Sequence, residues 1–367
     1  MIGELTSRRL VVCCGAGGVG KTTISASVAL RLAREGAKTV VVTIDPARRL
    51  ATALGMTGLS DDPQRVPAGA LLEGGGELWA LQLDAKATFD RLVSRYAADE
   101  EARDRILQNR IYAHLSGAVA GAQEYMAVER LHELVEETDF ECIVLDTPPA
   151  TNALDFLDAP QRITRFIEGR ALRLLLRPAS AGGGIGWRLI HAGSGTVLSL
   201  LERLTGAQLL RDVGDFLAGF DGMYQGFADR AQAIRELLLS DRSAFVVVSA
   251  PGGEPLRQAV ALTHRLGEEG FPLLGVVLNR VHPLPPGGLP AVDALSAALS
   301  SAPDPRGLAE RAAATLAEEQ VLGLRDLDAI ESLRGAIDDH PVITVPAFAR
   351  EPVELDGIAE VAAALGR

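Results

Sequence analysis

The residues with the clearest chemical potential form a glycine-rich segment, GAGGVGKTT, which runs from Gly15 to Thr23. The segment fits the pattern G-x-x-x-x-G-K-[ST] and lies between an apolar run and a helical stretch. Glycines let such a loop bend until successive backbone N–H groups point at phosphate oxygens, and the helix behind it adds its positive end. The spacing predicts a phosphate-binding loop made of Gly15, Gly17, Gly18, Val19, Gly20, Lys21, Thr22 and Thr23.

The last three residues of this loop have distinct expected roles. Lys21 is predicted to reach the β- and γ-phosphates, the Thr22 hydroxyl to bind Mg²⁺, and Thr23 to face the α-phosphate. Only three of the 36 basic residues in the chain are lysines, and the other 33 are arginines. A lysine at this position is therefore hard to attribute to random substitution. The alternative is a glycine-rich turn that merely precedes a helix, and the strand on one side with the helix on the other favours the phosphate loop.

Polar side chains also follow three other apolar runs, where each predicted strand ends. Asp45 follows TVVVTI, Asp146 follows ECIVL, and Asn279 follows LLGVVL. Ligands of open parallel sheets bind beyond the carboxyl ends of the strands. We therefore expect Asp45 to polarise a water facing the γ-phosphate, Asp146 to hold the Mg²⁺ shell, and the Asn279 amide to read a base edge.

Each carboxylate has a structural alternative. Asp45 could instead cap the next helix, with Pro46 at the first helical position, and spacing alone does not choose between the two roles. Asp146 could also be a capping residue, although a phosphate loop upstream favours the metal role. Asp84, which ends a further apolar run, is expected to cap the helix that begins at Ala85.

A sheet must bring these strand ends together, and the chain contains suitable strands as short apolar runs. Several are apolar throughout, as in strands covered on both faces of a parallel sheet. Helical stretches such as 22–34 and 255–266 alternate with them, which predicts a doubly wound α/β fold with a mainly parallel sheet. The expected strands are 10–14, 39–44, 77–83, 141–145, 244–249, 273–278 and 342–345.

Two intervals between these strands are too long for a simple crossover. We expect a phosphate-loop core at 1–150 and 241–367, with an added helical segment at 85–140, and a helical insertion subdomain at 151–240. The glycine-rich stretch ASAGGGIG lies inside that insertion, so we interpret it as a hinge or loop and not as a domain boundary. We find no internal repeat.

Composition excludes several classes of protein. The chain has 367 residues with 36 basic and 48 acidic side chains, and its net charge of −12 repels nucleic-acid backbones and anionic membrane surfaces. Its three cysteines and six histidines lack metal-ligand spacing, so we expect no zinc site. No apolar stretch is long enough for a signal-peptide core or a membrane span. We therefore expect a cytoplasmic protein with no nucleic-acid partner and no stable membrane insertion.

In this order along the chain, the segments resemble those of the ArsA family: the arsenite-pump ATPase and its relative that targets tail-anchored membrane proteins. DPARRL resembles the family's switch I, DPAHNL, and GAQEYMAVERL is similar to its helix before switch II. DTPPATNALDFLDAP looks like switch II, LNRV like the adenine-recognition region, and VPAFAREP like the C-terminal loop that closes over the base. The family belongs to the deviant-Walker-A branch of P-loop NTPases.

The resemblance implies a Mg²⁺-dependent ATPase. Lys21 and Asp45 would be catalytic, and Thr22 and Asp146 would hold the metal. Asn279 would contact adenine and make ATP the expected nucleotide, with Pro346 and Phe348 in the loop that closes over the base. Because the family works as a nucleotide-sandwich dimer or as two fused halves, this chain is expected to be a single half. It would form a homodimer or a heterodimer with a paralogous ATPase.

Four departures limit what can be carried over from the family. The second lysine of the family's phosphate loop, which reaches the partner's ATP, is replaced by Ala16, so Arg48, Arg49 or another subunit would have to supply that charge. The Gly-His of switch II is Thr151-Asn152 here. The metalloid-binding cysteines have no counterparts, which argues against arsenite as cargo. The CxxC that bridges zinc in the eukaryotic targeting factor is missing after Asn279.

The function of the helical insertion stays open at this stage. Its leucines, including Leu172 and Leu198, either pack the subdomain onto itself and the sheet or line a groove for a hydrophobic client. We expect an ATPase that couples its nucleotide state to such a protein client. The alternatives are a pseudo-ATPase or regulatory subunit that binds ATP and pairs with a paralogue, and a MinD/ParA-like spatial organiser. The single basic residue in the ending ELDGIAEVAAALGR argues against the last.

Overall fold

The computed structural model resolves the chain into two compact units. One comprises Met1–Leu81, Asp139–Ala153 and Leu238–Arg367, and the other Gln82–Thr138 and Leu154–Leu237. The residues that the structure describes are 2–72, 74–97, 99–109, 122–148, 224–284, 288–337, 339–352 and 354–366.

The first unit contains an eight-stranded sheet of order β3-β4-β2-β5-β1-β6-β7-β8. The pairings of β5 with β2 and β1, of β6 with β1 and β7, and of β7 with β8 are all parallel. The strands are β1 (Leu10–Gly15), β2 (Lys38–Thr43), β3 (Gln64–Arg65), β4 (Glu77–Gln82), β5 (Cys142–Asp146), β6 (Ser243–Ser249), β7 (Leu273–Val281) and β8 (Val342–Pro346).

The predicted fold class is confirmed, and each of the seven apolar runs forms a strand. β1, β5 and β6 are buried along their whole length, which is why their sequences are apolar throughout and not alternating. The sequence missed β3, a two-residue strand that pairs antiparallel with β4 through Gln64 and Arg65. Two polar residues carry no periodicity that could have indicated it.

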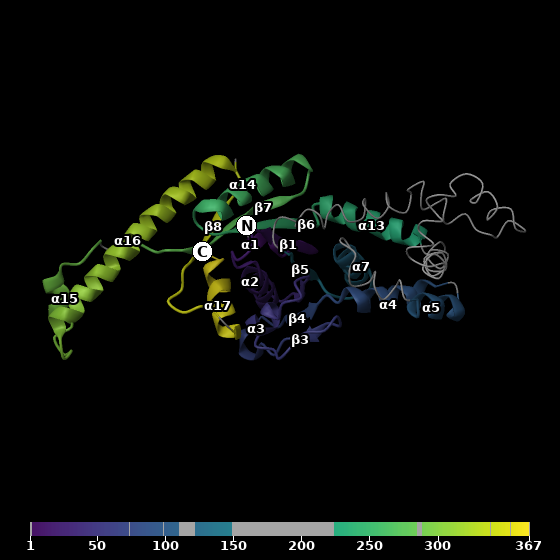
Figure 1. Cartoon of the computed structure of the whole chain (residues 1–367), viewed down its shortest axis with the longest axis horizontal. Coiled ribbons are helices and arrows are strands. Elements are labelled where there is room, and N and C mark those ends of the chain that lie inside the picture. Colours follow the sequence, from purple (N-terminus) through teal and green to yellow (C-terminus); the bar gives the residue numbers. More distant parts are fainter. Residues whose placement is uncertain are drawn as a thin grey trace, which may run out of the picture. The chain divides into compact units, whose positions relative to one another are not determined.

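Helices cover both faces of this sheet. On one face α2 (Lys21–Arg34) packs against α3 (Arg49–Ala53) and α17 (Glu354–Ala364), and on the other α14 (Gly253–Glu268) lies on β6 and β7 with α16 (Pro305–Ala336) beside it (Figure 1). The two helices expected at 22–34 and 255–266 correspond to α2 and α14. The remaining short helices of this unit are α1 (Ile2–Leu5), the 3₁₀ helix η1 (Gly69–Leu72) and α15 (Val292–Ala298).

The chain changes direction across the sheet at β1. The connection after β1 leads towards β2 on one side, whereas β6, β7 and β8 lie on the other. Such a switch point leaves a crevice at the carboxyl end of the central strand, where doubly wound proteins bind their ligands. The glycine-rich loop begins at that end of β1.

The second unit is helical in its described part. It contains α4 (Ala85–Tyr96), α5 (Glu100–Leu107), α7 (Ala122–Glu137) and most of α13 (Tyr224–Leu239). Asp84 caps α4 as predicted, because its carboxylate accepts the backbone N–H groups of Lys86 and Ala87 at 2.9 and 3.0 Å. The helical segment expected at 85–140 thus corresponds to α4, α5 and α7, while most of the expected insertion, 151–240, lies outside the described residues.

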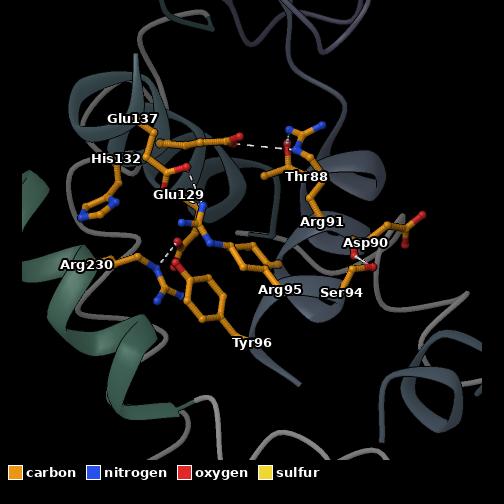
Figure 2. A pocket seen from close by; sticks show the side chains of 12 residues that line it. Thr88, Asp90, Arg91, Ser94, Arg95, Tyr96, Glu129, His132, Glu137 and Arg230 are labelled. Atoms are coloured by element: carbon orange, nitrogen blue, oxygen red, sulfur yellow. Dashed lines mark hydrogen bonds and ion pairs between the residues drawn. The ribbon is translucent and has the colours of Figure 1, made fainter. Parts of the chain in front are cut away.

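A buried ion pair joins α7 to α13 in this unit. The Arg230 guanidinium lies 2.6 Å from the Glu129 carboxylate, which also accepts the Tyr125 hydroxyl at 2.5 Å. Glu129 and Arg230 line a cavity of about 430 Å³, and Figure 2 shows their side chains pointing toward one another. The Arg230 guanidinium lies 4.2 Å from the centre of the Tyr96 ring. Burial raises the pKa of Glu129, and its hydrogen bond with Arg230 works in the opposite direction. The buried Glu129 carboxylate therefore needs the Arg230 cation beside it to stay charged.

Replacing Arg230 by methionine tests this dependence. The substitution keeps most of the side-chain volume but leaves the Glu129 carboxylate buried without its cation, so we expect the unit to lose about 3–5 kcal/mol of stability. The control is Lys86→Met, because Lys86 pairs with Asp90 on the exposed surface of α4 in the same unit and should contribute at most about 1 kcal/mol. Hydrogen exchange of α4, α7 and α13 measures the opening free energy. Equal effects of the two substitutions would contradict the assignment.

Candidate nucleotide site

The glycine-rich loop runs from the end of β1 to the first residue of α2, as a phosphate loop requires. Glycine is needed at two positions for steric reasons. A Cβ on Gly15 would lie 2.0 Å from the Val248 carbonyl oxygen, and one on Gly20 would lie 2.3 Å from Nδ2 of Asn279. Gly20 also has φ +93°, in the left-handed region that larger residues avoid. The loop geometry therefore accounts for these two glycines.

Lys21 lies inside the turn of the loop. Its ammonium group donates to the Ala16 carbonyl oxygen at 2.8 Å, and only 7% of the residue is exposed. Burial lowers the pKa of Lys21, while the nearby charges of Asp146 and Asp45 raise it. The lysine is the first residue of the 14-residue helix α2, so the helix dipole adds to its positive charge. Both features favour an anion at this point.

Asp146 is the buried carboxylate of the site. Its Oδ2 accepts the hydroxyls of Thr22 at 2.7 Å and Thr43 at 3.0 Å, and Oδ1 accepts Ser25 at 3.4 Å. Burial raises its pKa from 3.8 to about 6, against the lowering effect of the Thr22 and Thr43 hydrogen bonds. The structure thus pairs this carboxylate with side-chain hydroxyls, including that of Thr22, the residue predicted to share the metal with it.

These donors fit Mg²⁺. The ion prefers oxygen ligands and binds proteins through one or two carboxylates or hydroxyls while keeping several waters. Thr22 and Asp146 lie in direct contact at the end of the loop and offer a hydroxyl and a carboxylate. Elsewhere in the described chain, no group of three or more histidine, cysteine or acidic side chains is arranged to hold a metal.

Asp45 follows β2 in a short turn. Its Oδ1 accepts the backbone N–H of Ala47 at 2.9 Å, and its Oδ2 lies 3.7 Å from the Arg49 guanidinium. Helix α3 begins later, at Arg49, and its N-cap residue is Arg48, so the alternative that Asp45 caps this helix is wrong. The side chain stays 24% exposed, which leaves it accessible to water. Its charge acts on Lys21, so Asp45 belongs to the same electrostatic site.

Asn279 lies against the phosphate loop. Its Nδ2 donates to the Val19 carbonyl oxygen at 2.9 Å, and its Oδ1 accepts the backbone N–H of Arg280 at 3.0 Å. The C-terminal loop comes to the same end of the sheet, because β8 ends at Pro346 and the N–H of Ala347 donates to the Val281 carbonyl at 2.8 Å. Phe348 is partly buried against the core.

Sequence reasoning missed several residues that support the site. Thr43 and Ser25 hold Asp146 from β2 and α2, and Arg280 donates to the Gly18 carbonyl at 3.1 Å. The sequence could have indicated Thr43, because it lies at the end of a predicted strand that ends next to the loop. Ser25 falls one helical turn after Lys21, and this spacing becomes meaningful only once Asp146 is known to lie beside α2.

The three cysteines lie in the core. Cys13, Cys14 and Cys142 are free and buried within β1 and β5. Burial raises the pKa of Cys13 and of Cys142 to about 12, so these thiols stay protonated at neutral pH. They are poor metal ligands and poor nucleophiles in this state.

Known proteins are similar to this chain in sequence. The family described as anion-transporting ATPase, ArsA, matches residues 8–177, which include the loop, Asp45 and Asp146. An ATPase get3 of Schizosaccharomyces pombe is 28% identical over 157 residues, 43% of this chain and 45% of that protein. An uncharacterised Streptomyces coelicolor protein is 30% identical over 284 residues, 75% of this chain and 63% of that protein.

Residues 8–177 of the chain form a domain of the ArsA ATPase family. ATPase GET3A of Arabidopsis thaliana is also similar, with 24% identity over 277 residues, 75% of this chain and 67% of that protein. The chain spans a little under half the length of the Schizosaccharomyces pombe relative that it matches. The family prediction made from DPARRL and DTPPATNALDFLDAP is thereby confirmed.

One departure from the ArsA family pattern, Ala16, lies in the described part of the chain and is buried. Ala16, at the position of the family's second loop lysine, is 5% exposed and belongs to the hydrophobic core, while its carbonyl accepts Lys21. Of the two arginines considered as substitutes, Arg49 is the one that forms an ion pair with Asp45. Thr151-Asn152, the departure in the segment that resembles switch II, lies outside the described residues.

The raised pKa of Asp146 predicts that magnesium-dependent nucleotide binding is sensitive to pH. Below pH 6 the carboxyl group is protonated and must lose its proton to act as a metal ligand. We expect the affinity for Mg·ADP to fall as the pH drops from 7 to 5, approaching tenfold per unit below about pH 6. Above that pH the contribution of Asp146 should level off.

The matched variant for this measurement is Asp146→Asn. The phosphate groups of ADP titrate in the same range, and that contribution persists in the variant. The difference between the two pH profiles, measured by calorimetric titration with and without Mg²⁺, therefore reports Asp146 alone. Identical profiles for the wild type and Asp146→Asn would contradict the role of the carboxylate.

Proposed function

We propose that this ArsA family member is a Mg²⁺-dependent ATPase whose nucleotide state is coupled to a protein partner. The observation that carries the proposal is the convergence of Lys21, Thr22, Asp146 and Asp45 at the carboxyl ends of three neighbouring strands. A lysine at a helix N-terminus favours phosphates, and the hydroxyl–carboxylate pair suits magnesium. A magnesium-bound nucleoside triphosphate with its attacking water would use all four groups.

Each residue has a role in this proposal. Lys21 binds the β- and γ-phosphates and offsets the charge that develops on them, and the backbone N–H groups of the loop orient the same phosphates. Thr22 and Asp146 would hold Mg²⁺, which would neutralise part of the charge of the phosphates. Asp45, still accessible to water, orients and deprotonates the attacking water.

ATP is the proposed nucleotide. One N–H of the Asn279 amide is used on Val19, and an amide has a second N–H with which it can contact adenine. Pro346 and Phe348 lie in the loop that would close over the base, at the same end of the sheet. These residues would bind the base. The phosphate loop would bind the phosphates with an affinity that does not depend on which base the nucleotide carries.

We also propose that the chain is a single half that works as a dimer. Ala16 offers no charge to a partner's nucleotide, so phosphoryl transfer needs a cation from elsewhere. Arg49, on the first turn of α3, is one source within the chain, and the loop of a paralogous subunit is another. The first favours a homodimer and the second a heterodimer.

The coupled partner is proposed to be a protein client with a hydrophobic segment, bound through the helical insertion. The leucines expected to form its groove lie outside the described residues, so the proposal depends on the sequence and the family relationship. We place the protein in the cytoplasm. In the described part of the chain, no helix combines the length and hydrophobicity needed to cross a bilayer.

Two alternatives make different predictions. A pseudo-ATPase that binds ATP as a regulatory ligand is favoured by Ala16, because the buried methyl group offers no charge to a phosphate.

The MinD/ParA-like organiser is disfavoured, because the apolar side of α17 packs against α2. Ile358, Val361 and Ala362 on that helix are fully buried, which leaves no apolar face of α17 for a membrane.

Single-turnover hydrolysis separates these functions. With Mg·ATP, alone or mixed with any paralogous subunit, we expect hydrolysis that falls by about 100-fold or more in Asp45→Asn while nucleotide binding persists. Asp84→Asn is the control, because asparagine caps α4 as well as aspartate does. Binding without hydrolysis in every mixture would support the regulatory alternative. An unchanged rate in Asp45→Asn would remove Asp45 from the mechanism.

A further inference from the structure

Two consecutive residues at the end of β7 hold two consecutive carbonyls of the phosphate loop. The Asn279 amide donates to the Val19 carbonyl at 2.9 Å, and the Arg280 guanidinium donates to the Gly18 carbonyl at 3.1 Å. The loop and β7 are about 260 residues apart in sequence, so these bonds are tertiary. They are the contacts through which β7 restrains the otherwise exposed tip of the loop at Gly17 and Gly18.

Arg280 makes this contact while its backbone is in an unfavourable conformation. Its φ is +63°, in the left-handed region, which is unfavourable for an arginine. The register between β7 and β8 shifts between Leu278 and Val281. Within this irregularity the Arg280 N–H donates to Oδ1 of Asn279 at 3.0 Å. The strained conformation coincides with the residue whose side chain reaches the loop.

The two bonds fix the direction of loop N–H groups. In a trans peptide the carbonyl and the N–H of the next residue point in opposite directions. Holding the Gly18 carbonyl therefore directs the Val19 N–H away from Arg280, and holding the Val19 carbonyl directs the Gly20 N–H away from Asn279. N–H groups of such a loop are the donors that bind phosphate oxygens. Their orientation is thus set from the outer side of the loop.

We propose that Arg280 is a positioning residue for the phosphate loop. Its guanidinium holds the Gly18 peptide so that the Val19 N–H is oriented before the nucleotide arrives. The inference rests on the proposed function only in assuming that nucleotide phosphate is the ligand of the loop. The clamp itself is a property of the protein without ligand.

Arg280→Gly removes the side chain and tolerates the positive φ, so the backbone loses its strain as the loop loses its donor. We expect affinity for ADP to fall by about tenfold, as for the loss of one hydrogen bond from a charged donor, while the midpoint of thermal unfolding stays close to that of the wild type. Arg280→Lys retains a charged donor and should recover part of the loss. Arg257→Ala, on the exposed surface of α14, is the matched control.

Two readouts distinguish positioning from general structural support. Calorimetric titration measures ADP affinity, and hydrogen exchange of the segment 15–20 in the free protein should be faster in Arg280→Gly but not in Arg257→Ala. Unchanged exchange and unchanged ADP affinity in Arg280→Gly would overturn the inference. If the wild type bound no nucleotide, the proposed function would fail, and the exchange measurement would still decide whether Arg280 holds the loop.

Discussion

The arrangement of the site depends on one carboxylate that is held out of water. Asp146 ends β5 with 1% of its surface exposed, and a charge in that position is stable only if other groups compensate for its lost hydration. Hydroxyls from α2 and β2 and the nearby charge of Lys21 supply this compensation. Because the compensating groups come from separate elements, the buried charge fixes how α2, β2 and β5 meet.

The phosphate loop is stabilised from two sides by different kinds of contact. On the inner side Lys21 donates to the carbonyl of Ala16, and on the outer side Asn279 and Arg280 donate to Val19 and Gly18. These bonds account for a loop whose glycines alone would leave it flexible. They also connect the loop to the sheet edge at β7 and β8, where the base-binding residues are proposed to lie.

Much of this site could be predicted from sequence, because strand and loop signals are local. Apolar runs and GAGGVGKTT indicated the sheet and the loop, and polar residues at strand ends indicated Asp45 and Asp146. Contacts between distant segments carry no such signal. Arg280 acts on Gly18 across a sequence separation of 262 residues. The 32-residue helix α16 was missed because its alanines and charges show no clear apolar stripe.

The central claim is that the loop from Gly15 to Thr23 binds a magnesium-bound triphosphate. Isothermal calorimetry of Mg·ATP titrated into the protein, with any paralogous subunit included, tests it most directly. We expect one saturable site per chain that is weakened at least about tenfold by Lys21→Ala and left unchanged by Lys86→Ala, which alters an exposed ion pair in α4. No heat with the wild type, or equal binding by Lys21→Ala, would contradict the account.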